Sequence, residues 1–476
     1  MRLYLINPTN PLSIVNVKES RWNRYRVWKP LSLMVLASLT PPEWKISIID
    51  ENLGAPDYKS MPRPDLVGIT AFTSQANRAY EVASHFRRLG VPVIMGGIHA
   101  TMRLDEVMER VDCVVTGEAE GIWQQVLEDA RHGNLKRRYD GGLAEIETVP
   151  PARHDLLPAR YPFGAIQTTR GCPLNCNFCS VTAFNGALYR QRPIPDVVRE
   201  FQAIHEKHVL VVDDNLIGTR PEHIARAKDM FRAMAQANLR KEWVSQATIN
   251  FADDEELLTL AATAGCRGVF VGFESPTPEG LQELGKKFNL LKDRDFRASV
   301  RRIQRHGILV VGSFIMGLDI DEPGIGKRIA EAASQYGMDN LNVLFLTPLP
   351  GTRLWEQMES EGRIALDTFP EDWKYYTLTY PVARYKNLSL DDIIGEMMSC
   401  SRNFYSIPRI LRRMWSSFWQ RRKPLISLVG NLSYRGNIRV DCKAYADFMR
   451  QHGNGRDCAS GMSEQPNAEH NKPLKY

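Results

Sequence analysis

The chain has 476 residues, of which 43% are hydrophobic and 24% are charged, a composition typical of globular proteins. This composition excludes wholesale disorder and collagen-like structure, and the length predicts roughly three domains of about 150 residues each. The 61 Lys and Arg residues exceed the 55 Asp and Glu residues by only six. So small an excess does not by itself indicate a nucleic-acid partner.

Residues 1 to about 130 alternate short β-branched segments with helical segments, which predicts βαβ units and an open parallel sheet. The expected strands are 3–6, 46–50, 66–70, 93–95 and 113–116, and the expected helices are 31–39, 75–89, 104–110 and 118–131. The first residues are too short an apolar stretch for a signal peptide, and no apolar run approaches a membrane span. We therefore expect a doubly wound, Rossmann-like domain over 1–135 in a cytoplasmic protein.

The periodicity lapses over 136–161, where Gly141-Gly142 and Pro150-Pro151 indicate a linker. A second α/β series follows, with strands expected at 165–169, 209–213, 244–249, 268–272, 309–315 and 342–346. Six βα units within 162–350 predict a partial (β/α)6 barrel, smaller than a full eightfold barrel of about 250 residues. A mostly helical extension should occupy 351–453, and the polar tail 454–476 should be disordered.

Three cysteines lie close together in a loop after the first barrel strand, where Cys172, Cys176 and Cys179 are spaced C-x-x-x-C-x-x-C. Three soft thiolate ligands in one short loop favour an iron–sulfur cluster. A zinc site and buried, unligated cysteines are the alternatives. Zinc would normally need a fourth ligand, and neither Cys266 nor His154 lies at a typical finger spacing. The order and number of cysteines also differ from the bacterial ferredoxin pattern.

This loop, with Phe178 before its last cysteine, resembles the signature of the radical S-adenosylmethionine enzymes. The resemblance implies that Cys172, Cys176 and Cys179 hold a [4Fe–4S] cluster. The open iron of that cluster would chelate the amino and carboxylate groups of S-adenosylmethionine. An electron from a reductant such as flavodoxin or ferredoxin would then cleave the sulfonium and yield a 5′-deoxyadenosyl radical.

Polar residues at the ends of later barrel strands are candidates for binding S-adenosylmethionine. Glu274 and Ser275 end the fourth strand, where such enzymes often place a polar or acidic residue, and a carboxylate there could pair with the cofactor's ammonium. Asp213 and Gln246 lie at the ends of the second and third strands. For each residue alone, a solvated loop or a helix cap is an equally open interpretation.

A doubly wound domain ahead of such a barrel is similar to the cobalamin-binding class of this superfamily, over residues 1 to about 380. The positions that match the family's cobalamin pattern are Thr70, Thr73, Ser74, Gly96, Gly97, Gly117 and Glu118. Many of these domains carry D-x-H-x-x-G, whose histidine ligates cobalt, but the loop at 7–12 contains no histidine. His99 is a conceivable substitute, although a lone loop histidine is more often a hydrogen-bonding surface residue. A domain that packs without cobalamin is the remaining alternative.

The resemblance implies an enzyme, most often a cobalamin-dependent methylase that acts on an unactivated carbon of a small-molecule or lipid substrate. Oxidative cyclization and rearrangement are alternatives within the class, and nothing in the sequence separates these reactions. A methylthiotransferase would bring three further cluster cysteines in its first domain, where Cys113 stands alone. A non-catalytic iron–sulfur sensor that binds nucleic acid is the alternative from another class.

The segment 409–439 contains no acidic residue, and Trp415, Phe418 and Trp419 lie among its basic residues. These are Arg409, Arg412, Arg413, Arg421, Arg422, Lys423, Arg435 and Arg439. Three interpretations are open: a solvated helical face with its aromatic residues packed inward, peripheral membrane contact that reaches a lipid substrate, or nucleic-acid binding. Nucleic acid is the least expected of these partners.

Overall fold

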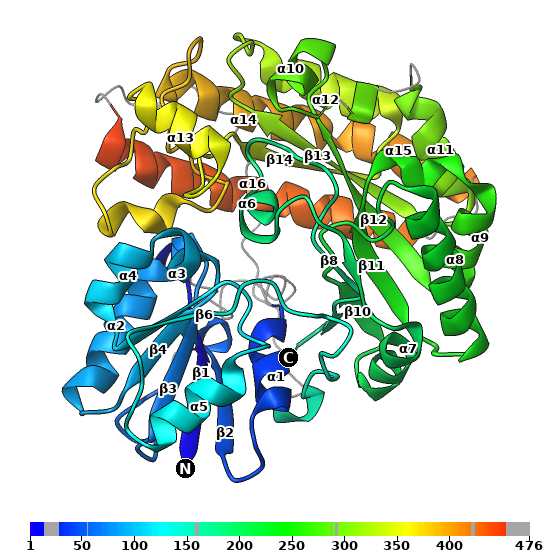
Figure 1. The fold of residues 1–476 in the computed structure, drawn as a ribbon. Coiled ribbons are helices and arrows are strands. Elements are labelled where there is room, and N and C mark those ends of the chain that lie inside the picture. Colours follow the sequence, from blue (N-terminus) through cyan, green and yellow to red (C-terminus); the bar gives the residue numbers. More distant parts are fainter. Residues whose placement is uncertain are drawn as a thin grey trace, which may run out of the picture.

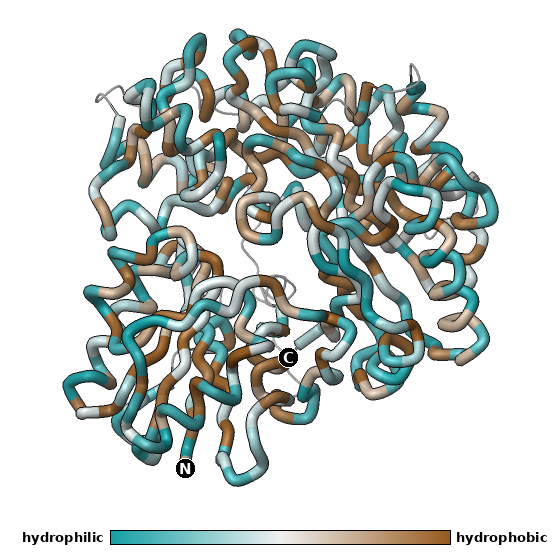
Figure 2. Tube along the Cα trace, in the orientation of Figure 1, coloured by the Kyte–Doolittle hydropathy of each residue, from teal (hydrophilic) through white to brown (hydrophobic). Residues whose placement is uncertain are grey.

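The computed structural model describes residues 1–13, 28–54, 56–157, 161–286, 288–290, 294–419 and 424–453. The predictions for the tail 454–476 and for Arg421, Arg422 and Lys423 lie outside these residues, as do the side chains of Phe418 and Trp419. Two six-stranded sheets with helices around them follow one another along the chain (Figure 1). Apolar residues concentrate along the strands and on the inward sides of the helices (Figure 2).

The N-terminal sheet has the order β2-β1-β3-β4-β5-β6, and all its strand pairs are parallel. Its strands are β1 Arg2–Asn7, β2 Lys45–Asp50, β3 Leu66–Thr70, β4 Val93–Gly96, β5 Cys113–Thr116 and β6 Arg138–Asp140. The first five match the predicted strands, but β6 lies within the segment predicted to be a linker. Only its middle residue, Tyr139, is buried, so this edge strand carries almost no hydrophobic pattern.

Helices cover both faces of this sheet, as a doubly wound fold requires. They are α1 Leu31–Leu39, α2 Ala76–Arg88, α3 Ile98–Met102, α4 Leu104–Arg110 and α5 Trp123–Arg131. Leu3 and Leu5 of β1 pack with α1 and α5, whereas Tyr4 and Ile6 pack on the opposite face with α2 and α4. The strand order reverses between β1 and β3, and a switch point of this kind opens a crevice at the carboxyl ends of the strands.

The second sheet is an open, partial barrel of six parallel strands in the order β14-β13-β12-β11-β10-β7, which confirms the predicted class. Its strands are β7 Gly164–Ile166, β10 His208–Val211, β11 Glu242–Ala247, β12 Cys266–Glu274, β13 Leu309–Met316 and β14 Asn340–Phe345. The first of them ends earlier than predicted, at Ile166. The chain then forms β8 Thr169–Arg170, which pairs antiparallel with β9 Arg190–Gln191 and so brackets the cysteine loop.

The barrel helices and the C-terminal extension complete the molecule. The barrel helices are α6 Ser180–Asn185, α7 Ile194–Ala203, α8 Pro221–Gln236, α9 Glu255–Thr263, α10 Pro278–Glu283, α11 Phe296–Arg305 and α12 Ile325–Tyr336. The extension contains α13 Arg353–Ser360, the 3-10 helix η8 Glu371–Tyr375, α14 Leu390–Phe404, α15 Ile407–Trp419 and α16 Pro424–His452. Helix α14 packs on α12, and α15 packs against α16. Within the described residues, no helix combines the length and apolarity needed to cross a membrane.

Arginines of the basic segment pack inward, and its first tryptophan faces solvent. Arg413 donates to Asn431 Oδ1 at 2.6 and 3.0 Å, and its guanidinium lies 4.0 Å from the Phe404 ring centroid. Arg435 donates to the Tyr405 carbonyl at 2.8 Å. Trp415 is 63% exposed, so the expectation of inward-packed aromatic residues is wrong for this residue.

Replacing Arg413 with alanine should lower the free energy of unfolding by about 2–4 kcal/mol, because it removes a partly buried cation and leaves the oxygen of Asn431 without these donors. The neighbouring exposed Arg412→Ala should change it by less than about 0.5 kcal/mol. Denaturant titration followed by circular dichroism measures both values. Equal effects of the two substitutions would contradict the structural role of Arg413.

Candidate functional site

A cavity of about 1170 Å³ lies between the N-terminal domain, the barrel and the C-terminal helices. The N-terminal domain contributes the residues that follow β3, β4 and β5, which is the crevice at the switch point. The barrel contributes Arg170 and the helix α6 that directly follows the cysteine loop. The extension contributes residues of α14 and α16. One cavity is therefore bounded by all three parts of the chain.

Small residues keep the N-terminal floor of this cavity open. The predicted positions that line it are Thr70, Ser74, Gly96, Gly97, Gly117 and Glu118. Gly97 has φ +92°, and a Cβ added there would lie 2.8 Å from Thr70 Oγ1. Gly117 has φ +69°, and a Cβ there would lie 2.6 Å from the Gly142 carbonyl oxygen. Side chains at these two positions are excluded by backbone strain and by the neighbouring protein atoms. We call this part of the cavity lining, built from glycines and other small residues, the glycine-lined cradle.

Two of the predicted cobalamin positions do not present free groups to this cavity. Thr73 is buried, and its Oγ1 lies 3.4 Å from His99 Nδ1. Glu118 borders the cavity, but its carboxylate accepts from Arg170 and Ala144, each at 2.8 Å, and also pairs with Arg190. Burial raises the pKa of Glu118, but hydrogen bonds from Arg190 and the charge of Arg170 outweigh this and hold the pKa below its usual value.

The contacts of Glu118 join the N-terminal domain to the cysteine loop. Arg170 and Arg190 belong to β8 and β9, the pair of strands that brackets the loop. Arg170 also lies 2.8 Å from Glu120, so two carboxylates of the N-terminal domain hold one barrel arginine. Glu118 is therefore an interface residue that also borders the cavity, and its contact with cobalamin stays a prediction.

His99 neither faces the cavity nor lies on the surface, so both interpretations considered for it are wrong. It is fully buried, and its Nε2 lies 2.8 Å from the Tyr80 hydroxyl and 3.6 Å from Glu106 Oε1. Its ring also packs edge-on against Trp373 of η8. Burial lowers the pKa of His99, which favours the neutral ring. His99 thus belongs to the contact between the N-terminal domain and the extension.

Phe72 is a lining residue of the cavity that the sequence analysis did not single out. Its side chain is 68% exposed, although it is large and apolar, and it lines the cavity beside the loop that lacks a histidine. Gln75 ties the two loops together, because its Oε1 accepts from Phe72 N at 2.9 Å and its Nε2 donates to the Pro8 carbonyl at 2.6 Å. An aromatic face is thereby held at the switch point.

The cysteine loop suits a multi-iron cluster. Cys172, Cys176 and Cys179 are free thiols, and Asn215 Nδ2 lies 3.7 Å from Cys172 Sγ, where it can stabilise a thiolate. Burial raises the pKa of Cys172, and that of Cys176 to about 11, while the positive charge of Lys286 lowers both. In the described part of the chain, no three His, Cys, Asp or Glu side chains converge as a single metal ion requires.

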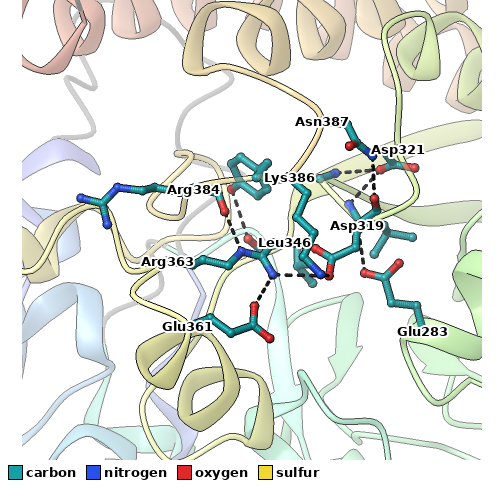
Figure 3. Close-up of polar contacts among 12 residues, drawn as sticks. Glu283, Asp319, Asp321, Leu346, Glu361, Arg363, Arg384, Lys386 and Asn387 are labelled. Atoms are coloured by element: carbon teal, nitrogen blue, oxygen red, sulfur yellow. Dashed lines mark hydrogen bonds and ion pairs between the residues drawn. The ribbon is translucent and has the colours of Figure 1, made fainter.

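Backbone and side-chain contacts hold the loop from outside. Leu354 N, at the start of α13, donates to the Asn177 carbonyl at 3.1 Å, and Asn177 Nδ2 donates to the Glu283 carbonyl at 3.0 Å. Phe178 packs against the core. Further contacts extend from Glu283 to the extension (Figure 3). The Asp319 amide donates to Glu283 at 2.8 Å, and Arg363 pairs with Asp319 at 2.6 Å. The extension therefore supports the loop through α10 and α13.

The predicted S-adenosylmethionine residues divide into two groups. Asp213 is buried and accepts from Thr168 N at 2.6 Å, so it fixes the end of β7, and burial raises its pKa to about 6. Ser275 is also buried and accepts from Thr277 N at 3.2 Å in the turn before α10. Both residues thus have hydrogen-bond partners within the chain, and their contact with S-adenosylmethionine stays a prediction. Gln246 is exposed at the end of β11, and Glu274 forms an ion pair at the end of β12.

Two protein-family models match the chain, one within the N-terminal domain and one within the barrel. The Radical SAM superfamily model matches residues 166–323, and the B12 binding domain model matches residues 25–127. The chain belongs to the cobalamin-binding radical S-adenosylmethionine enzymes. The two domains imply a [4Fe–4S] cluster, S-adenosylmethionine and cobalamin as cofactors, and the thiol loop and the glycine-lined cradle fit them.

Relatives match over most of the chain. It is 28% identical to bacteriochlorophyllide d C-12(1)-methyltransferase of Chlorobaculum tepidum, over 81% of this chain and 84% of that protein. It is 25% identical to hopanoid C-2 methylase of Rhodopseudomonas palustris, over 81% and 72%. The fold matches a structure of TsrM from Kitasatospora setae with TM-score 0.65 and 19% identity, over 84% of this chain and 88% of that chain. These enzymes are methyltransferases by name, and this radical S-adenosylmethionine enzyme falls within their family.

Replacing Glu118 with glutamine should lower the free energy of unfolding by about 1–3 kcal/mol at pH 7, because two arginines lose their charged acceptor. The lowered pKa means that the carboxylate contributes its full stability above the unfolded glutamate pKa of about 4.3 and loses it as the pH falls through the folded value. The difference between wild type and variant should therefore shrink in acid. Thermal unfolding between pH 2.5 and pH 8 measures it, and a difference that stays constant below pH 4 would contradict the ion pair.

The place of Phe72 predicts that its ring contacts bound cobalamin where other domains supply a histidine. The electron paramagnetic resonance spectrum of the bound Co(II) form should therefore show no nitrogen coupling from the protein in the wild type. Phe72→His should introduce such coupling, and Phe72→Leu should not. Nitrogen coupling in the wild type, or its absence from Phe72→His with cobalamin bound, would contradict this placement.

Proposed function

We propose that this enzyme transfers a methyl group to an unactivated carbon of a small-molecule or lipid substrate. The observation that carries the proposal is the single cavity shared by the glycine-lined cradle, the helix after the cysteine loop, and the C-terminal helices. The cofactors, when bound, supply a carbon radical and the methyl group. The chain's own task is to hold them beside one substrate and to limit access of water.

Each part of the cavity has a distinct task in this proposal. Cys172, Cys176 and Cys179 hold the cluster, while Thr70, Ser74, Gly96 and Gly97 border the space for cobalamin. The substrate would lie against the extension, whose lining residues are mostly apolar or aromatic. They include Tyr380, Met397, Met398, Tyr405, Tyr434, Ile438 and Tyr445. A lining of this kind favours a substrate with a large apolar body.

The names of the relatives agree with such a substrate. Bacteriochlorophyllide d and hopanoid methyltransferases match this chain at 25–28% identity over 80–89% of its length. The anaerobic magnesium-protoporphyrin IX monomethyl ester cyclase of Cereibacter sphaeroides is 23% identical and is matched over 63% of its length. Methylation is therefore favoured over cyclization.

The electron donor and the membrane contact are predictions that belong to this proposal. A flavodoxin or ferredoxin would supply the electron, and the segment 409–439 would make a peripheral membrane contact. Ile407, Leu411 and Trp415 support the second, because they share one side of α15 at four-residue spacing and are 46%, 50% and 63% exposed. Arg412 is exposed beside them, as contact with anionic lipid would require.

Anaerobic reconstitution with iron, sulfide and cobalamin, followed by dithionite and S-adenosylmethionine, tests the proposed function. The wild type should bind cobalamin and release 5′-deoxyadenosine, and Cys176→Ser should lose cluster iron and release none. Cys442→Ser, a partly exposed cysteine of α16, is the matched control and should keep both properties. Release of 5′-deoxyadenosine without cobalamin binding would retain the radical chemistry and remove cobalamin from the proposal.

A further inference from the structure

Helix α16 runs along β14, the edge strand of the barrel sheet. A Cβ added to Gly430 would lie 3.2 Å from Nδ2 of Asn340, the first residue of β14. Further along the helix, the ring of Tyr445 packs edge-on against Phe345, the last residue of β14, with 6.1 Å between the ring centroids. These two contacts occur in the same order along both elements. The residues of α16 between them therefore lie beside residues 341–344.

Three uncharged polar side chains line the cavity at this contact. Asn342 belongs to β14, Asn437 belongs to α16, and Tyr380 lies in the segment before α14. The Tyr380 ring centroid is 6.0 Å from that of Tyr445, which places it beside the same stretch of α16. None of the three side chains is fully buried, and none hydrogen-bonds to another residue that the structure describes. Two amides and one phenol are therefore available to a ligand in the cavity.

The charged groups of the cavity lining do not favour an anion at this place. Among the described lining residues there are two cations, and both are paired outside the extension. Lys29 Nζ lies 2.6 Å from Glu206 Oε1, and Arg170 pairs with two carboxylates of the N-terminal domain. The described residues of the extension contribute to the lining no cation and one carboxylate, that of Asp441, one turn after Asn437. A carboxylate or phosphate bound here would lose its hydration without gaining a cation.

We propose that Asn342, Asn437 and Tyr380 bind the uncharged, hydroxyl-bearing end of an otherwise apolar substrate. This inference rests on the proposed function and deepens it, because it names the class of substrate. A carboxamide both donates and accepts hydrogen bonds, as a phenol does, and an alcohol does the same. The two sides therefore match in both roles without any charge. The aromatic and methionine side chains of the extension cover the apolar body of the substrate.

Three lipids with the same acyl chain test the assignment on the full chain, reconstituted with its cluster and loaded with cobalamin. 1-Lauroylglycerol carries uncharged hydroxyls, 1-lauroylglycerol 3-phosphate carries an anion, and methyl laurate carries no hydroxyl. Anaerobic equilibrium dialysis of each radiolabelled lipid, below its critical micelle concentration, measures Kd. The wild type should bind 1-lauroylglycerol about 10-fold or more tightly than the phosphate.

Substitutions in the cavity should change this binding selectively. Asn342→Leu and Asn437→Leu keep the size of the side chain but remove the amide. Each should weaken binding of 1-lauroylglycerol about 5-fold or more and that of methyl laurate less than about 2-fold. Asn342→Lys supplies a cation and should raise the affinity for the phosphate about 10-fold, a gain that a misfolded chain cannot show. Asn134→Leu, at an exposed asparagine between α5 and β6, is the matched control and should change no value.

Leu411→Ser, on the exposed side of α15, separates binding in the cavity from binding to the outer surface of the extension. It should leave all three values unchanged, and loss of 1-lauroylglycerol binding in this variant overturns the inference. Equal affinity of the wild type for 1-lauroylglycerol and the phosphate also overturns it, as do equal losses for 1-lauroylglycerol and methyl laurate in Asn437→Leu. Failure of the proposed function looks different, since it appears as a wild type without bound cobalamin or without release of 5′-deoxyadenosine.

Discussion

The carboxylate of Glu118 fixes the two halves of the molecule relative to one another. It follows Gly117, which borders the cobalamin cradle, and it pairs with Arg170, two residues before the first cysteine of the cluster loop. The distance between the glycine-lined cradle and the cysteine loop is therefore constrained by two short peptide segments and by the ion pairs of Glu118 with Arg170 and Arg190. Reactions that pass a group between bound partners depend on such positioning, and a small displacement is costly.

Much of the fold could be predicted because strands buried on both faces are nearly continuous apolar runs. The strands β3 and β5 are of this kind, and the predicted bounds agree with the structure. The strand β6 was not predicted, because only one of its three residues is buried and it has no hydrophobic pattern. In the candidate site, the glycines and small residues that line the cavity could be predicted from their place after strands, since that place is fixed by the parallel sheet.

The remaining site residues could not be predicted because their partners lie far away in sequence. Glu118 pairs with an arginine 52 residues further on, and Trp373 donates to Glu106 across 267 residues. A sequence shows that a polar residue ends a strand, but it does not show whether that residue already has a hydrogen-bond partner elsewhere in the chain. Asp213 is an example, because its sequence position alone leaves both a ligand contact and a structural role open, and only the structure shows that Thr168 donates to it. For the same reason the sequence left three interpretations open for α15, where in the structure an arginine packs inward and a tryptophan faces out.

The extension lines the cavity and contacts both the N-terminal domain and the cysteine loop. Trp373 of η8 donates to Glu106 at 2.9 Å, and Asn10 donates to the backbone of η8 at 3.0 Å, so the extension holds the N-terminal domain. At its other end, Leu354 donates to Asn177 within the cluster loop. The extension is thus hydrogen-bonded to both the N-terminal domain and the barrel. This connection is separate from the ion pairs of Glu118. Because two independent connections fix one orientation, substitution of either should loosen the spacing of the cofactor sites without dismantling either site.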